Sequence, residues 1–191
     1  GSDRSAGRPD RARRHIHTTF DLVRRGRRRA RRLPNRPSRL IRSWGLLADL
    51  SKMTTLAFKA EGEAILLLGG HGSHLGQSIY LREVLGREEG APPPVDLARE
   101  KRHGDFVRNL INHRQVTAVH DISDGGLGLA AIEMTLAGKL GARLDAMDHV
   151  ALFAEDQARY LLACPAAAAA KIILEVEIGV AFEAAAIQAA I

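Results

Sequence analysis

The sequence predicts an α/β fold or a layered α+β fold with helices on a β-sheet. Of the two we expect the α+β fold, with a mixed β-sheet in a layered α/β/α arrangement. Short apolar runs of strand length alternate along the chain with longer segments of helical periodicity. A length of 191 residues gives room for one sizeable domain and a tail. An apolar fraction of 46% with 4% aromatic residues is typical of an aliphatic interior in a soluble protein.

Several protein classes are excluded by composition. Cys164 is the only cysteine, so no intramolecular disulfide can form, and a reducing compartment is compatible with this. No apolar run reaches the roughly 18–20 residues that a membrane span needs. The N-terminus has no uninterrupted apolar stretch of the signal-peptide type. We therefore expect a cytoplasmic protein without a membrane partner.

The first 43 residues differ from the rest of the chain. They hold 15 Arg, no Lys and 3 Asp, a net charge of +12, whereas the remaining residues carry −6. We expect 1–43 to be disordered alone, because it lacks sustained apolar periodicity. Three interpretations stay open: out-of-frame translation or a mis-set start codon, a solvated tail, and an arm that binds nucleic acid. The segment adjoins no nucleic-acid recognition fold and has no aromatic platform on which bases could stack. We therefore do not expect nucleic acid as a partner.

From Trp44 the composition becomes globular, and we expect the folded domain over 44–191. Residues 45–50 and 53–58 are predicted as short strands, or as a strand and a turn, and 64–68 as a strand. A helix capped by Gln77 and Ser78 should run to about residue 85. The consecutive prolines at 92–94 form a connector that no helix can cross.

Asp96 is a plausible cap for a long helix reaching about residue 113. Its inward stripe should contain Leu97, Phe106, Leu110 and Ile111. The elements expected after it are strand 117–120, helix 126–137, short strand 142–144, strand 160–164 and helix 166–177. We assign no element to 178–191.

The junction between strand 117–120 and helix 126–137 is the strongest candidate site. It carries His120, Asp121, Ser123 and Asp124, followed by Gly125-Gly126. Glycines and a helix N-terminus offer backbone N–H groups to an anion, and carboxylates can hold a cation. The plain alternative is a capped turn, in which Asp124 accepts an N–H from the first turn of the helix.

A glycine-rich loop over 69–78 is the second candidate. It carries His74, Gln77 and Ser78 before a helix, and could cradle a phosphate. The loop is not a Walker A motif, because it lacks the Gly-Lys-Ser/Thr sequence.

These two motifs flank a third, Gly86-Arg87-Glu88-Glu89-Gly90-Ala91-Pro92-Pro93-Pro94-Val95-Asp96-Leu97. In their order and spacing the three closely resemble the last domain of the phosphoribosylformylglycinamidine synthase family, over roughly 45–160. The resemblance implies the fold of the C-terminal domain of aminoimidazole ribonucleotide synthetases. It departs from the family pattern just before Gly45, and again over 178–191. We therefore expect the domain to be incomplete at its C-terminal end.

The resemblance also implies an activity. The family is an ATP-dependent carbon–nitrogen ligase of de novo purine biosynthesis, which converts formylglycinamide ribonucleotide and glutamine-derived ammonia to formylglycinamidine ribonucleotide. Its cofactors are Mg²⁺ and ATP or ADP, and its partners are the other synthetase domains and a glutaminase subunit or domain. The catalytic residues of the family lie in domains that this chain does not match. We therefore expect the isolated chain to be a fragment without turnover.

Site residues are implied by matching positions. Asp121 matches an acid that holds Mg²⁺, and Glu155-Asp156-Gln157 resembles a substrate-facing Glu-Ser-Gln triplet, with Asp in place of Ser. The positions implied to hold nucleotide or substrate are His120, Ser123, Asp124, Gly125, Gly126, His74, Gln77, Ser78, Glu155, Asp156 and Gln157. In this last domain their implied role is to hold a ligand and not to catalyse.

A different class of function stays open beside the ligase. In this alternative the chain is a stand-alone, non-catalytic binding module whose Arg-rich tail contacts nucleic acid.

Overall fold

The computed structural model describes residues 47, 49–145, 147–179 and 184–187. The chain divides into two units, Gly1–Gly45 and Leu46–Ile191, and all described residues belong to the second. The predictions on 1–43 and most of those on 178–191 therefore lie outside the described residues. In the described part of the chain, no helix is long and apolar enough to cross a membrane.

The described residues form a four-stranded sheet. Its strands are β1 (Glu63–Leu68), β2 (Ala118–Asp121), β3 (Tyr160–Pro165) and β4 (Ala184–Ile187), in the order β2-β3-β1-β4. All three strand pairs are antiparallel, and an isolated parallel bridge joins Thr55 to Ala118. The strands predicted at 64–68, 117–120 and 160–164 are confirmed within a residue or two. β4 falls in the segment to which the sequence assigned no element.

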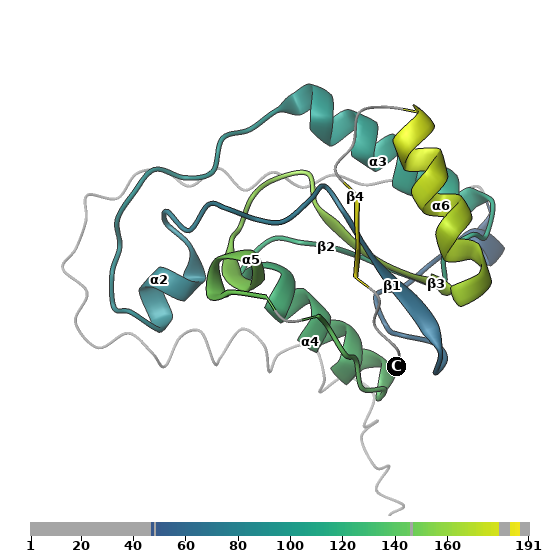
Figure 1. Cartoon of the computed structure of the whole chain (residues 1–191), viewed down its shortest axis with the longest axis horizontal. Coiled ribbons are helices and arrows are strands. Elements are labelled where there is room, and N and C mark those ends of the chain that lie inside the picture. The colour runs from purple at the N-terminus through teal and green to yellow at the C-terminus, as the bar shows by residue number, and fades with distance from the viewer. Residues whose placement is uncertain (1–46, 48, 146, 180–183, 188–191) are drawn as a thin grey trace, which may run out of the picture. The chain divides into compact units, whose positions relative to one another are not determined.

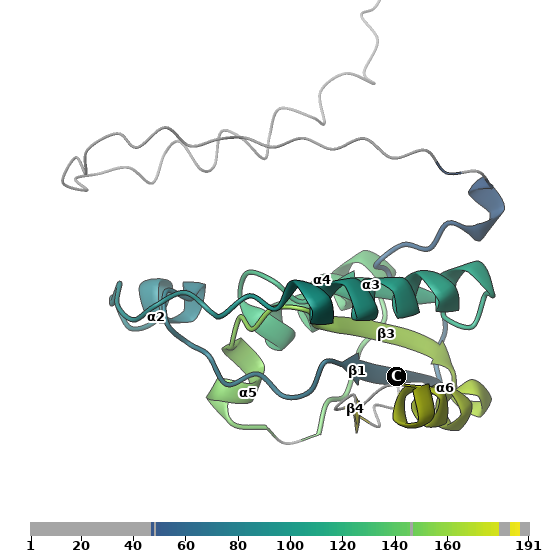
Figure 2. The ribbon, with the colours of Figure 1, turned by 90° about the horizontal axis from the view of Figure 1, so that it is seen from above.

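Helices cover both faces of this sheet, as Figures 1 and 2 show. On one face lie α3 (Leu97–Asn112) and α6 (Ala166–Gly179), and on the other lies α4 (Gly126–Gly138) with the short α5 (His149–Phe153) beside it. The short helix α2 (Ile79–Glu83) lies near α5, where Tyr80 stacks on Phe153 at 4.8 Å between ring centroids. The predicted layered α/β/α fold is confirmed. The sheet was predicted to be mixed, but its described strands pair only antiparallel, and the bridge at Thr55 is its one described parallel contact.

Two hydrophobic clusters fill the space between the layers. Successive residues of β1 point to opposite faces, so Ile65 and Leu67 pack toward α4, while Leu66 and Leu68 pack toward α3 and α6. All four side chains are buried, which explains the continuous apolar run of this strand. Burial on both faces fixes the register, because a one-residue slip would exchange the two sets.

Three local predictions differ from the structure. Residues 53–58 contribute only the bridge at Thr55, after the 3-10 helix η2 (Leu50–Lys52), and 142–144 form no strand. Both segments have apolar residues that pack on the core from irregular backbone, so hydrophobicity alone was misleading. Leu97 is 76% exposed, because the period of about 3.6 residues per turn places it on a different side of α3 from the buried residues His103, Val107 and Leu110.

Candidate functional site

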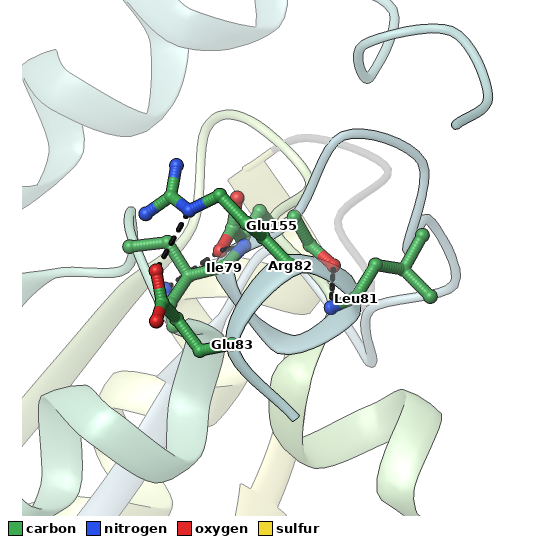
Figure 3. Close-up of polar contacts among 7 residues, drawn as sticks. Ile79, Leu81, Arg82, Glu83 and Glu155 are labelled. Carbon is green, nitrogen blue, oxygen red and sulfur yellow. Dashed lines mark hydrogen bonds and ion pairs between the residues drawn. The ribbon is translucent and has the colours of Figure 1, made fainter. Parts of the chain in front are cut away.

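Glu155 joins two of the predicted motifs. One carboxylate oxygen, Oε1, accepts hydrogen bonds from the backbone N–H of Gly125 and from that of Ile79, both at 2.8 Å. Figure 3 shows Glu155 beside the start of α2, with dashed lines marking hydrogen bonds. The turn before α4 and the end of the glycine-rich loop are therefore held together by one side chain.

Asp156 holds the middle of the same loop. Its Oδ2 accepts from the backbone N–H of Ser73 at 2.8 Å and of His74 at 2.9 Å, and the Ser73 hydroxyl lies 3.3 Å from Oδ1. Burial alone would raise the pKa of Asp156, but the hydrogen bonds from His74 and Ser73 and the charge of Arg159 outweigh it, so the pKa lies below its ordinary value. The carboxylate is therefore ionised at neutral pH.

The loop residues predicted to bind a ligand are also engaged. His74 donates through Nε2 to the carbonyl of Ala91 at 2.7 Å, and Gln77 donates to the carbonyl of Gly90 at 2.9 Å. The Ser78 hydroxyl caps α2 by accepting from the N–H of Leu81 at 3.2 Å. These three side chains attach the glycine-rich loop to the connector before α3 and start α2.

The start of α4 is built differently from the capped turn. Gly125 is the N-cap, with φ +77°, and no side chain among the described residues caps the helix there. Gly126 follows with φ +67°, and a Cβ on it would lie 2.7 Å from the carbonyl oxygens of Leu152 and Ala154, so only glycine fits. The alternative in which Asp124 caps α4 is therefore wrong. The N–H of Gly125 already donates to Glu155, and that of Gly126 donates to the carbonyl of Ser123 at 3.1 Å, so an anion would meet the N–H groups that follow in the first turn.

Other predicted site residues lie at the end of β2, in the turn that follows it, and before β3. His120 is 14% exposed at the end of β2 and donates through Nε2 to Glu133 Oε2 at 2.7 Å, while its Nδ1 lies 3.3 Å from Asp121 Oδ1. The Asp121 side chain is 69% exposed, and Ser123, Asp124 and Gln157 are exposed as well. Glu133 was not among the site residues predicted from the sequence. Its contact with His120 across thirteen residues depends on how α4 folds back, for which the sequence has no local signal.

The donor set of this junction fits part of a magnesium site. Mg²⁺ prefers hard oxygen ligands, and usually takes one or two carboxylates together with phosphate oxygens and water. Asp121 offers an exposed carboxylate of this kind. In the described part of the chain no cluster of three or more His, Cys, Asp or Glu could hold a metal ion alone. A magnesium ion at Asp121 would therefore need further ligands from water, a phosphate or another polypeptide.

Comparison with known sequences decides the family. Residues 60–187 match the sequence model of "AIR synthase related protein, C-terminal domain". The chain belongs to this family. Phosphoribosylformylglycinamidine synthase subunit PurL of Rhodopseudomonas palustris (strain TIE-1) is 60% identical over 131 residues, which cover 66% of this chain and 18% of the relative. The corresponding subunit of Bradyrhizobium diazoefficiens is 54% identical over 142 residues, covering 72% and 19%. The resemblance stated from the three motifs is confirmed, and the chain spans about a fifth of the length of these relatives.

Solved structures agree on the fold of the AIR synthase related C-terminal domain. "T. maritima PurL complexed with FGAR" superposes with a TM-score of 0.61 at 18% identity, covering 74% of this chain and 26% of that one. "T. maritima PurL complexed with ADP" gives a TM-score of 0.57 at the same identity, covering 74% and 23%. At this identity the likeness establishes the fold, and the predicted fold class is confirmed.

Proposed function

We propose that this chain is the last domain of a phosphoribosylformylglycinamidine synthase, an ATP-dependent carbon–nitrogen ligase of purine biosynthesis. The observation that carries the proposal is the 60% identity to a subunit of that name over 131 residues. The matched family segment, 60–187, contains all the motifs of the candidate site. Because the chain spans 18% of that relative, catalysis requires the rest of the synthetase.

Within the complete enzyme we assign this domain to ligand holding. The first turn of α4, beyond Gly126, would face phosphate oxygens of ATP or ADP with its backbone N–H groups. Asp121 would hold Mg²⁺, which neutralises phosphate charge when bound. Glu155 and Asp156 would act indirectly, because their carboxylate oxygens bind the backbone of the two loops that face the ligand and hold these loops in place. Preorganised backbone of this kind positions substrates without reorganising during the reaction.

The proposed substrate and partners follow from the same relatives. We expect formylglycinamide ribonucleotide to be the acceptor and a glutaminase subunit or domain to supply ammonia. Support comes from a Thermotoga maritima structure described as PurL complexed with FGAR, and from another described as PurLQS. Chemically, the amide oxygen of the substrate is phosphorylated, and ammonia then displaces the phosphate.

A domain exchange tests the proposal. Residues 60–187 would replace the matching segment of the Rhodopseudomonas palustris subunit, and the chimera would be assayed for growth without purines in a strain that lacks the synthetase. We expect growth with the chimera and none with the isolated chain. The matched control carries Asp121→Ala and should fold normally but support little growth. A soluble, folded chimera without activity would contradict the proposal, as would turnover by the purified chain alone.

A further inference from the structure

One residue beside the candidate site has a backbone conformation that alanine rarely adopts. Ala158 has φ +60°, in the left-handed region, and it is buried directly after the Glu155-Asp156-Gln157 triplet. A residue with a Cβ is strained there by about 1–2 kcal/mol and stays there only where its surroundings enforce it. The question is which groups hold it.

Both backbone polar groups of Ala158 are bound by the same helix, α3. Its N–H donates to Glu100 Oε1 at 2.8 Å, and its carbonyl oxygen lies 2.6 Å from His103 Nδ1. A carbonyl can only accept, so His103 must carry a hydrogen on Nδ1. His103 is 1% exposed, and burial lowers its pKa, so the ring is held neutral.

The same helix also reaches the glycine-rich loop. Arg99 donates to the carbonyl of Gly69, at the end of β1. Gly69 has φ +96°, and a Cβ on it would lie 2.6 Å from the carbonyl oxygen of Ala158, so the two chain segments touch. Next to Ala158, the buried Arg159 donates to the carbonyls of Gly70 at 3.1 Å and Ala154 at 3.0 Å. The exit of β1 and the entry of β3 are thus joined at Ala158.

We propose that Glu100 and His103 are positioning residues, which clamp Ala158 in its left-handed conformation and thereby aim Glu155 and Asp156 at the loops of the site. Neither residue needs to touch the ligand. α3 lies on the face of the sheet opposite α4, as Figure 1 shows. The clamp therefore acts on the start of α4 through the chain segment 155–158. Only the description of this region as a ligand site rests on the proposed function.

Amide hydrogen exchange of the unliganded chain tests the clamp directly. The reporters are the amides of Ser73, His74, Ile79 and Gly125, which donate to Asp156 and Glu155. We expect His103→Phe and Glu100→Ala each to lower their protection roughly tenfold, the factor for losing about one hydrogen bond. Protection along the β1 and β3 pairing should change by less than about twofold.

Conservative variants separate positioning from general destabilisation. His103→Asn places an amide N–H near the position of Nδ1, and Glu100→Gln keeps an acceptor oxygen, so both should retain most of the protection. Adding Ala158→Gly to His103→Phe should restore at least half of the decrease in the logarithm of the protection factor, because glycine occupies the left-handed region without strain. A uniform loss along the whole sheet, or no rescue by Ala158→Gly, would overturn the clamp.

The exchange experiment is independent of the proposed activity. In the domain-exchange chimera, Glu100→Ala should lower activity while Glu100→Gln should not. If the chimera with unmodified 60–187 is inactive while the exchange pattern holds, the proposed function fails and the clamp stands. If the chimera is active and the exchange pattern is uniform, the clamp fails and the proposed function stands.

Discussion

The two acidic turns of the candidate site use their carboxylates in opposite ways. At the entry of β3, Glu155 and Asp156 accept four backbone N–H hydrogen bonds from three other segments. At the exit of β2, the Asp121 side chain is 69% exposed and Asp124 is exposed too. In the described part of the chain, neither carboxylate accepts a hydrogen bond from a backbone N–H. The first pair holds the structure together, and the second pair is open to solvent.

This difference separates residues that build the site from residues that can meet a ligand. A carboxylate that satisfies several backbone donors is expensive to replace, because the donors are left without partners. An exposed carboxylate contributes little to stability and remains free to exchange water for a cation. The two turns should therefore respond differently to the same kind of substitution.

Replacement of Glu155 should have the largest effect on stability. Glu155→Ala leaves the N–H groups of Gly125 and Ile79 without their acceptor, and we expect the free energy of unfolding to fall by about 2–4 kcal/mol. Urea denaturation followed by circular dichroism measures this. The exposed neighbour supplies the control, since Gln157→Ala should change stability by less than about 0.5 kcal/mol. Equal effects of the two variants would contradict the structural role of Glu155.

Asp156 should contribute less at neutral pH and should add a pH dependence. We expect Asp156→Asn to cost about 1–2 kcal/mol, because the amide oxygen can accept both N–H groups but lacks the charge that strengthens these hydrogen bonds. The pKa of Asp156 is lowered in the folded chain from 3.8, so the unfolded chain takes up the proton more readily. Its stabilisation is complete above the unfolded pKa and is lost as pH falls through the folded pKa.

Thermal unfolding between about pH 2.5 and pH 7 checks this sign. The unmodified chain should lose more stability at the acidic end than Asp156→Asn does, since the variant has no carboxyl group to protonate. If stability fell with decreasing pH by the same amount in both proteins, Asp156 would not contribute to the loss of stability in acid.

The smallest change in stability is expected at Asp121. Asp121→Ala removes an exposed carboxylate whose described contact is His120 Nδ1 at 3.3 Å, so stability should change by at most about 0.5 kcal/mol. In the domain-exchange chimera, however, the same variant should raise the Mg²⁺ concentration for half-maximal activity at least tenfold. Glu61→Ala is the control, because Glu61 is an exposed acid outside the candidate site. An unchanged Mg²⁺ requirement would remove Asp121 from the proposed metal site.

Local chemistry accounts for the elements that the sequence predicts correctly. Asp96 precedes a segment of helical periodicity and does cap α3, and the apolar run after Glu63 does form a strand buried on both faces. The three motifs also led to the correct family, because their glycines and acids are contiguous in the sequence. The short helix α5 and strand β4 were missed. Five residues carry little periodicity, and the pairing of Ala184–Ile187 with β1 depends on a partner more than a hundred residues away.

The amino-acid sequence by itself therefore determined the layered fold, the positions of the main elements and the family, because propensity, capping and periodicity act over a few residues. Only the tertiary structure showed which acids accept backbone hydrogen bonds and which are exposed to solvent. The contacts of Glu155 with Gly125 and Ile79, of His120 with Glu133, and of His103 with Ala158 span 13 to 76 residues. Such contacts exist because strand order and helix placement bring distant backbone groups within hydrogen-bond distance, and no local pattern encodes them.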